Sequence, residues 1–365
     1  MRVLVVNAGS SSLKVRLLGA DNAVLFADDQ AHQGSFDPLA LRTTIAKVAD
    51  RVDAIGHRIV HGGTKYTTAV VIDAVVEREL RQLTNLAPLH QPKSLAGIDA
   101  IRGLLSDVPA VACFDTAFHT TMPDEAATYA VPAEWRERYG VRRYGFHGLS
   151  HAYASRRAAE LIGRPVEQLR IVTCHLGAGA SLAAVHHGIS VDTTMGFTPL
   201  EGLVMATRSG TIDPGLVTWL LQRTELTVDQ IADALEHTSG LLALAGSSDM
   251  AVVVEGAAGG DARSQLAIGL YVHRLRAGIA SMASAMNGVD TLVFTGGVGE
   301  NGPSIRAGAV AGLGFLGAQI DQRANALREI DADISAPGAS VRTVVVAARE
   351  DVQIAAEVRA LLTSS

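Results

Sequence analysis

The chain is poor in lysine and cysteine and has no long hydrophobic run, and each of these shortages argues against a particular kind of site or segment. Four lysines stand against 27 arginines, and no Gly-Lys-Ser or Gly-Lys-Thr triplet occurs, so a nucleotide would not be bound by a Walker A loop. The two cysteines, Cys113 and Cys174, lie in apolar strand-like runs, which favours reduced, buried thiols over a disulfide. We expect no membrane span and no signal peptide, because the apolar runs are too short.

An excess of charge of one sign is also missing. The net charge is −6 with no block of like charges, so we expect neither a nucleic-acid footprint nor a polybasic membrane patch. What is present is a core-forming composition, with 48% hydrophobic and 19% charged residues, which excludes a mainly disordered chain. A length of 365 residues predicts two domains or one large duplicated fold, in a soluble cytoplasmic protein.

Strand-like and helix-like segments alternate along the chain, which predicts an α/β architecture. An apolar strand at 2–6, a Gly-Ser turn and a return strand at 13–18 are echoed at 171–175 and 182–185, with His175 in place of Asn7. This partial repeat indicates two related halves. Further strands are expected at 110–115, 292–294 and 341–347, and helices at 73–86, 93–105, 217–223, 228–237, 262–286 and 351–362. A domain boundary is expected near the start of the stretch 129–146.

Two of the predicted turns are rich in hydrogen-bond donors. In NAGSSSLK (7–14), Gly9 allows close approach of the backbone, and the serines offer hydroxyls and amides suited to phosphate oxygens. A serine-rich turn by itself is more often an ordinary polar hairpin. Its place after a buried strand and its echo in HLGAGAS (175–181) favour phosphate binding, with a polyphosphate held between two facing turns.

A third glycine turn, GGVGEN (296–301), follows a predicted strand and precedes a predicted helix. Its glycines would let a flat purine ring lie against bare backbone, although such turns are common in α/β proteins. Two carboxylates, Asp115 and Glu350, are expected at strand ends, where they could hold magnesium or a cationic partner. The alternative for each is a helix N-cap or a first-turn acid.

Two arginines and one histidine stand out by their surroundings. Arg58 in GHRIVHGG and Arg208 in MATRSGTIDPG are both expected where a strand meets a loop, placed as guanidinium forks for a carboxylate or phosphate. A structural ion pair is the competing interpretation for each. His147 in RRYGFHGLSH is expected in a turn, where it could donate a hydrogen bond to a developing oxyanion.

Taken in order along nearly the whole chain, these signatures resemble those of the acetate kinases: VLVVNAGSSSLK, GHRIVHGG, LAPLHQP, FDTAFHTTMP, RRYGFHGLSH, TCHLGAGAS, TTMGFTPLEGL, TRSGTIDPG and FTGGVGEN. The resemblance implies the duplicated actin-like ATPase fold that these enzymes share with sugar kinases, with two domains closing over a nucleotide cleft. It implies an N-terminal domain of residues 1–119 plus 352–365, and a C-terminal domain of 120–351 that carries the second phosphate loop, the adenosine site and the face of a homodimer. The predicted helix at 262–286 could supply that face or could be core.

The resemblance also implies roles for individual residues. The catalytic set is Arg58, Asp115, His147 and Arg208. The groups that bind the carboxylic acid are Arg58, Val60, Leu89, His90, Phe146 and Pro199. The nucleotide would be bound by Ser10, Ser12, Lys14, His175, Gly177, Gly179, Asp249, Gly296, Gly297, Val298 and Asn301. Magnesium, or manganese, would lie near Asn7 and Glu350.

Two positions depart from the family pattern. Ala178 stands where the second phosphate loop usually has Asn, and Ala251 stands where the adenosine region usually has Arg. Both changes bear on nucleotide affinity and choice more than on phosphoryl transfer.

A carboxylate acceptor is ionised at neutral pH and needs no general base, so the chemical problem is repulsion between two anions. The expected reaction is reversible in-line transfer of the γ-phosphoryl group of ATP to acetate, giving acetyl phosphate and ADP. A propionate or butyrate kinase, or a non-catalytic ATP-dependent switch, are the alternatives.

Overall fold

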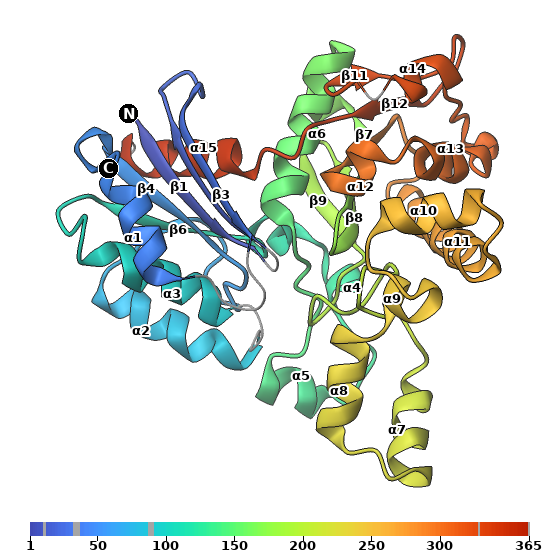
Figure 1. The fold of residues 1–365 in the computed structure, drawn as a ribbon, viewed down its shortest axis with the longest axis horizontal. Coiled ribbons are helices and arrows are strands. Elements are labelled where there is room, and N and C mark those ends of the chain that lie inside the picture. The colour runs from blue at the N-terminus through green and yellow to red at the C-terminus, as the bar shows by residue number, and fades with distance from the viewer. Residues whose placement is uncertain (10–11, 32–36, 87–90, 328, 364–365) are drawn as a thin grey trace. The chain divides into compact units, whose positions relative to one another are not determined.

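The computed structural model describes residues 1–9, 12–31, 37–86, 91–327 and 329–363 (Figure 1). The chain forms two compact units. The first contains Met1–Thr120, Phe146–Tyr153 and Arg349–Ser365, and the second contains Thr121–Gly145 and Ala154–Ala348. These bounds differ from the expected ones chiefly in assigning Phe146–Tyr153 to the first unit.

The first unit is built on a six-stranded mixed sheet in the order β3-β2-β1-β4-β6-β5. Strands β1 and β2 are antiparallel neighbours, whereas β1, β4 and β6 run parallel. The strands are β1 (Val3–Ala8), β2 (Ser12–Leu18), β3 (Val24–Ala31), β4 (Ala54–Ile59), β5 (Val70–Val71) and β6 (Ala110–Phe114). Parallel neighbours bring the carboxyl ends of β1, β4 and β6 to one edge of the sheet.

Alternation of side chains along β1 divides the core of this unit into two layers. Leu4 and Val6 pack toward α1 (Pro38–Ala46) and α3 (Gln91–Arg102). Val3 and Val5 pack on the other face, against α15 (Glu350–Thr363). Helix α2 (Ala74–Gln82) joins the α3 side, so helices cover both faces of the sheet (Figure 1).

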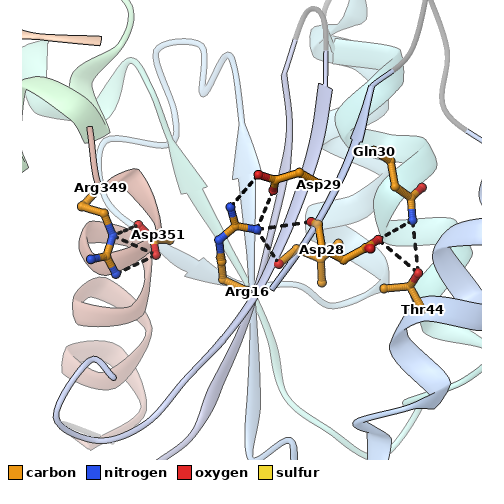
Figure 2. Close-up of polar contacts among 8 residues, drawn as sticks. Arg16, Asp28, Asp29, Gln30, Thr44, Arg349 and Asp351 are labelled. Carbon is orange, nitrogen blue, oxygen red and sulfur yellow. Dashed lines mark hydrogen bonds and ion pairs between the residues drawn. The ribbon is translucent and has the colours of Figure 1, made fainter. Parts of the chain in front are cut away.

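Ion pairs and hydrogen bonds fix the edge of this sheet and the start of α15 (Figure 2). Arg16 on β2 donates to both carboxylate oxygens of Asp29 on β3, at 2.5 and 2.8 Å. Next to Glu350, Arg349 donates from Nε to Oδ1 of Asp351 at 2.9 Å (Figure 2). These polar groups, of which Asp29 is exposed and the others are half-buried, are therefore paired locally.

The second unit repeats the arrangement of the first. Its sheet has the order β11-β12-β10-β7-β8-β9, which read from the other end has the same pattern of neighbours and strand directions. The strands are β7 (Arg170–Leu176), β8 (Ala180–His186), β9 (Ile189–Thr193), β10 (Thr291–Thr295), β11 (Ala332–Asp333) and β12 (Arg342–Val345). The duplication predicted from the repeated strand–turn–strand opening is confirmed at the level of topology, and the α/β class with it.

Helix α11 (Ala262–Ala285) buries one stripe, including Leu275 and Ile279, and packs on β7, β8 and β9. One side of the expected helix at 262–286 is therefore core, whereas its other side, which carries Leu266, is exposed. The remaining α-helices are α4 (Asp124–Ala127), α5 (Ala133–Tyr139), α6 (Gly148–Ile162), α7 (Pro214–Arg223), α8 (Val228–His237), α9 (Gly240–Ala245), α10 (Met250–Ala258), α12 (Gly296–Asn301), α13 (Pro303–Ala311) and α14 (Gln322–Ala326).

Among the described residues, one stretch, Gly240–Ala258, is long and apolar enough to cross a membrane by length and composition alone. It consists of α9 and α10, and the side chain of Asp249 caps the second helix after a break. Neither helix alone has the roughly 20 residues that a span needs. Cys113 and Cys174 are buried free thiols, as predicted.

Two local expectations were wrong. Arg208 does not end a strand, because no strand occurs between β9 and β10; it lies in an irregular segment held by side chains and turns. The segment 296–301 is not a turn but the short helix α12, which begins directly after β10; the helix expected after it is α13. Gly296 makes this abrupt change possible with a φ of 78°, which side-chain-bearing residues rarely adopt.

Candidate functional site

In the first unit, three predicted site residues lie at the carboxyl ends of neighbouring strands. Asn7 is next to last on β1, Arg58 is next to last on β4, and Asp115 follows β6 directly. Each is an even number of residues beyond a side chain that packs on α15, so alternation along the strands directs all three to that face. Helix α15 begins there with Glu350.

These four side chains form one hydrogen-bonded network. Arg58 donates from Nε and Nη2 to Oδ2 of Asp115, at 3.0 and 2.5 Å. Its Nη1 donates to Oδ1 of Asn7 at 3.2 Å, and Nδ2 of Asn7 donates to Oε2 of Glu350 at 2.6 Å. Asn7 therefore joins the Arg58–Asp115 ion pair to the carboxylate at the start of α15.

The ionisation of Arg58 is set by its surroundings. Burial alone would lower the pKa of its guanidinium, but the negative charges of Asp115 and Glu350 outweigh burial and hold that pKa above its ordinary value. Burial raises the pKa of the Asp115 carboxyl, and the facing guanidinium opposes that rise. The result is a firmly cationic group whose orientation is fixed by a nearly inaccessible carboxylate.

The acidic end of this network suits a hard divalent cation. Mg²⁺ prefers oxygen ligands and is commonly held by one or two carboxylates together with substrate phosphates, and Glu350 offers such a carboxylate. The amide oxygen of Asn7 is already used by Arg58, and its nitrogen faces Glu350. Asn7 thus orients the carboxylate of Glu350, and its own part in binding a metal stays a prediction.

His147 lies just before α6 with a φ of 57°, a backbone conformation that is costly for a residue other than glycine. The preceding residue, Phe146, is buried, and its carbonyl is 3.0 Å from Nε2 of the buried His119. The ring of Phe146 meets the ring of His61 edge-on, with centroids 5.6 Å apart. Val60, next to His61 in the chain, is also buried.

The predicted first phosphate loop lies partly within the described residues. Gly9 donates its backbone N–H to the carbonyl of Ser12 at 2.9 Å, closing the turn between β1 and β2. Lys14 pairs with Asn7 in the sheet register and is exposed. Ser10, Leu89 and His90 lie outside the described residues.

In the second unit, Arg208 is buried and donates from Nη1 to the carbonyl of Pro199 at 2.6 Å. Within the described residues, no carboxylate lies within ion-pairing distance of its guanidinium. Burial lowers its pKa, and the more distant charge of Glu236 opposes this. A buried, directed cation without a direct counter-charge is suited to accept an anion.

The second glycine loop lies beside the Arg208 segment. His175 is next to last on β7, the place that Asn7 has on β1. Gly177 donates its N–H to the carbonyl of Gly179 at 2.9 Å, and the N–H of Ala206 donates to the carbonyl of Ala178 at 3.1 Å. This backbone contact ties the loop to the turn that carries Arg208.

The start of α12 packs on the same edge of the second sheet. A Cβ at Gly296 would lie 2.8 Å from the carbonyl oxygen of Leu176, whereas Gly297 faces open space and leaves bare backbone accessible. Val298 is half-buried in the same turn. Asn301 closes the helix by donating to the carbonyl of Gly297 at 3.0 Å, and Asp249 accepts from the N–H of Ala251 at 2.8 Å as the N-cap of α10. Asn301 and Asp249 therefore each form a hydrogen bond that stabilises an end of a helix.

Sequence reasoning missed a polar cluster in the second unit, made by Tyr129, Arg143 and Glu201. Glu201 accepts hydrogen bonds from Tyr129 and from Arg143, the latter at 2.8 Å. Arg143 and Glu201 lie within the motifs RRYGFHG and TTMGFTPLEGL, but nothing in the sequence pairs residues 58 positions apart.

Comparison with known proteins identifies the family of this chain. The model of the Acetokinase family matches residues 27–356. The chain belongs to the acetokinase family. It is 43% identical over 392 residues to an acetate kinase of Geobacillus kaustophilus (strain HTA426), covering 99% of each chain.

Two solved members of the family are similar over nearly their whole length. An acetate kinase of Porphyromonas gingivalis has a TM-score of 0.90 and 36% identity, covering 99% of both chains. A propionate kinase of Francisella tularensis has a TM-score of 0.91 and 36% identity, covering 98% of this chain and 99% of that one. The fold is thus the two-domain, actin-like ATPase fold of this family.

Proposed function

We propose that this protein is an acetate kinase, which transfers the γ-phosphoryl group of ATP to acetate and gives acetyl phosphate and ADP. One observation supports this beyond family membership: Arg58 and Arg208, both largely shielded from solvent, are held in different ways. Arg58 is fixed by a buried carboxylate, and Arg208 is directed by a carbonyl without a direct counter-charge. Cationic groups of this kind are needed when two anions must react.

The acceptor requires no general base, because acetate is ionised at neutral pH. Asp115 is engaged by two nitrogens of Arg58, so its role is to orient that cation and not to remove a proton. We assign Arg58, Arg208 and His147 to stabilising the charge on the transferring phosphoryl group, which moves in line from ADP to the carboxylate oxygen, and we assign Arg208 also to binding that carboxylate. The φ of 57° at His147 and the contact of His119 with the Phe146 carbonyl define the backbone that carries this imidazole.

A divalent cation, Mg²⁺ or Mn²⁺, would supply positive charge to the phosphates when bound. Glu350 is the residue that would hold it, directly or through water, and Asn7 orients Glu350. The nucleotide phosphates would be bound by Ser10, Ser12, Lys14, His175 and the backbone of Gly177 and Gly179. The adenosine would lie on Gly296, Gly297 and Val298, beside Asp249 and Asn301.

The acid's methyl group would lie against Val60, Leu89, Phe146 and Pro199, with His90 nearby. The likeness to a propionate kinase makes a longer acid the second candidate. One methylene is worth only about 1–3 kcal/mol in such a pocket, so both acids could be turned over at different rates.

The test is to incubate the protein with ATP, magnesium, hydroxylamine and, in turn, acetate, propionate or butyrate. We expect acyl hydroxamate that depends on the acid, with the highest kcat/KM for acetate. A higher value for propionate would reassign the substrate. ATP hydrolysis that is indifferent to any acid would instead favour a non-catalytic ATP-dependent switch.

We further infer a cytoplasmic homodimer. The buried thiols are reduced, and ATP is the substrate. Helix α7 of the second unit exposes Leu216, Trp219 and Leu221 and buries no residue of its own in the described chain. An apolar helix left so exposed is typical of an interaction surface. Sedimentation equilibrium should give twice the chain mass, and Trp219→Glu should give the monomer.

A further inference from the structure

The segment 194–203 of the second unit, here called the Pro199 loop, has no regular secondary structure. Its backbone groups therefore cannot all be satisfied by a helix or sheet ladder, and side chains must hold its shape. The loop matters because the carbonyl of Pro199 accepts the 2.6 Å hydrogen bond from Arg208.

Arg143 holds both ends of this loop. From Nη1 it donates to the carbonyls of Thr194 and Met195, at 3.2 and 3.0 Å, and from Nη2 to Oε1 of Glu201 at 2.8 Å. Its own backbone N–H donates to the carbonyl of Ala127 at 2.8 Å. The planar guanidinium thus joins the first residues of the loop to a carboxylate near its end, which a lysine could not do with the same geometry.

Tyr129 completes the arrangement from the other side. Its hydroxyl donates to Oε2 of Glu201 and accepts the backbone N–H of Phe197 at 3.0 Å. Its ring lies under the guanidinium of Arg143, 5.4 Å from centroid to Cζ. A Cβ at Gly196 would overlap both the Tyr129 hydroxyl and the Glu201 carboxylate, so the loop is packed closely against them.

We propose that Tyr129, Arg143 and Glu201 form a clamp that positions the Pro199 loop, and through the Pro199 carbonyl the guanidinium of Arg208, for the carboxylate substrate. The three are positioning residues: their contacts run to the loop, whereas Arg208 is the group that would meet the anion. The inference rests on the proposed function and deepens it, because it names residues that set affinity for the acid.

The alternative is that the cluster only stabilises the fold. The second unit offers a matched control in Arg157, which forms a half-buried ion pair with Asp331 at 2.9 Å. If the clamp acts through Arg208, its loss should weaken use of the acid more than use of ATP. If it is only structural, its loss should resemble the loss of the Arg157 pair.

The experiment measures KM for acetate, KM for ATP, kcat and the melting temperature of Arg143→Met, Glu201→Gln, Tyr129→Phe and the control Arg157→Met in the full chain. We expect KM for acetate to rise by about tenfold in the first three, because a small displacement of a charged group is costly. KM for ATP should stay within about twofold, and Arg157→Met should leave both constants unchanged. Tyr129→Phe removes one oxygen only, so it carries the test if Arg143→Met does not fold.

A second measurement checks the route through Arg208. In an Arg208→Lys background, Glu201→Gln should raise KM for acetate by less than it does in the wild type, because the two changes affect the same contact. The clamp proposal would be wrong if KM for acetate were unchanged in all three clamp variants, or if it rose equally in the clamp and control variants. Neither result would contradict the proposed function. A wild type that forms no acyl phosphate would overturn the proposed function and this inference together.

Discussion

Arg58 and Asp115 form a buried ion pair at the carboxyl ends of β4 and β6, with Nη2 and Oδ2 2.5 Å apart and side chains 12% and 1% exposed. The surroundings of Arg208 are different. Among the described residues, its guanidinium forms a hydrogen bond only with the carbonyl of Pro199. Arg58 is thus held in place by a buried carboxylate, whereas the positive charge of Arg208 is available to bind an anion. The two should respond differently to mutation.

Arg58→Ala should lower kcat on the order of 10²–10³-fold, as expected for loss of a preorganised charge stabiliser. It should also destabilise the fold by about 3–5 kcal/mol, because Asp115 would be left buried and unpaired. Steady-state kinetics and urea unfolding measure the two effects. The control is Arg2→Ala, which removes an exposed pair with Asp53 from the same unit and should change neither. Near wild-type turnover in Arg58→Ala would contradict its assigned role.

Arg208→Met should also lower kcat on the order of 10²–10³-fold, but with unchanged or raised thermal stability. The reason is that this variant removes a buried charge which has no direct counter-ion in the described chain and fills its volume with an apolar group. Steady-state kinetics measure kcat, and differential scanning calorimetry measures the melting temperature of this variant and of the wild type. A melting temperature that falls as far as in Arg58→Ala would mean that Arg208 is mainly structural.

Ala178→Asn should lower KM for ATP. Ala178 is exposed in the loop between β7 and β8, so the larger side chain fits without displacing the core and adds an amide donor beside the backbone N–H groups. Initial rates at varied ATP and saturating acetate provide the measurement. An unchanged KM would show that this loop binds phosphate through its backbone alone.

Glu350→Gln should raise the magnesium concentration needed for half-maximal activity by about tenfold or more, because the neutral amide is a weaker ligand for a hard cation. A titration with MgCl₂ at fixed free ATP gives this value. Glu357→Gln, two turns along the same helix, is the control and should leave it unchanged. Equal magnesium dependence in the two variants would place the metal elsewhere.

Stability should fall as the pH falls from about 6.5 to 4. His57 lies in a cavity of about 300 Å³ between α3 and the first sheet, and burial lowers its pKa from 6.5 to about 4. In that window the unfolded chain binds a proton that the native chain does not, so the free energy of unfolding drops by roughly 3 kcal/mol for such a residue. His61 and His119 contribute in the same direction.

Urea unfolding at several pH values measures this loss, and His57→Leu should make the dependence shallower. The free energy of unfolding falls with pH because the native state holds the imidazole neutral. A pH dependence identical to the wild type in His57→Leu would contradict the burial effect.

Sequence alone determined the elements whose signals are local. Apolar runs bounded by Gly, Ser and Asp marked β1, β6 and β7 to within two residues, and the repeated strand–turn–strand opening indicated a duplicated α/β fold. The same period-two pattern already implies that Asn7 and the hydrophobic residues two and four before it share a face of the sheet. Residues 58 and 115 were marked by their positions next to strand ends.

Only the tertiary structure decided which of these groups meet. That Asn7 holds both Arg58 and Glu350, which are 292 positions apart in the chain, follows from strand order and from the return of α15 to the first sheet. The irregular segment around Arg208 and the Tyr129–Arg143–Glu201 clamp carry no periodic signal, since their shape comes from side-chain hydrogen bonds between distant residues. Periodicity reports local backbone geometry, and it does not report such long-range pairing.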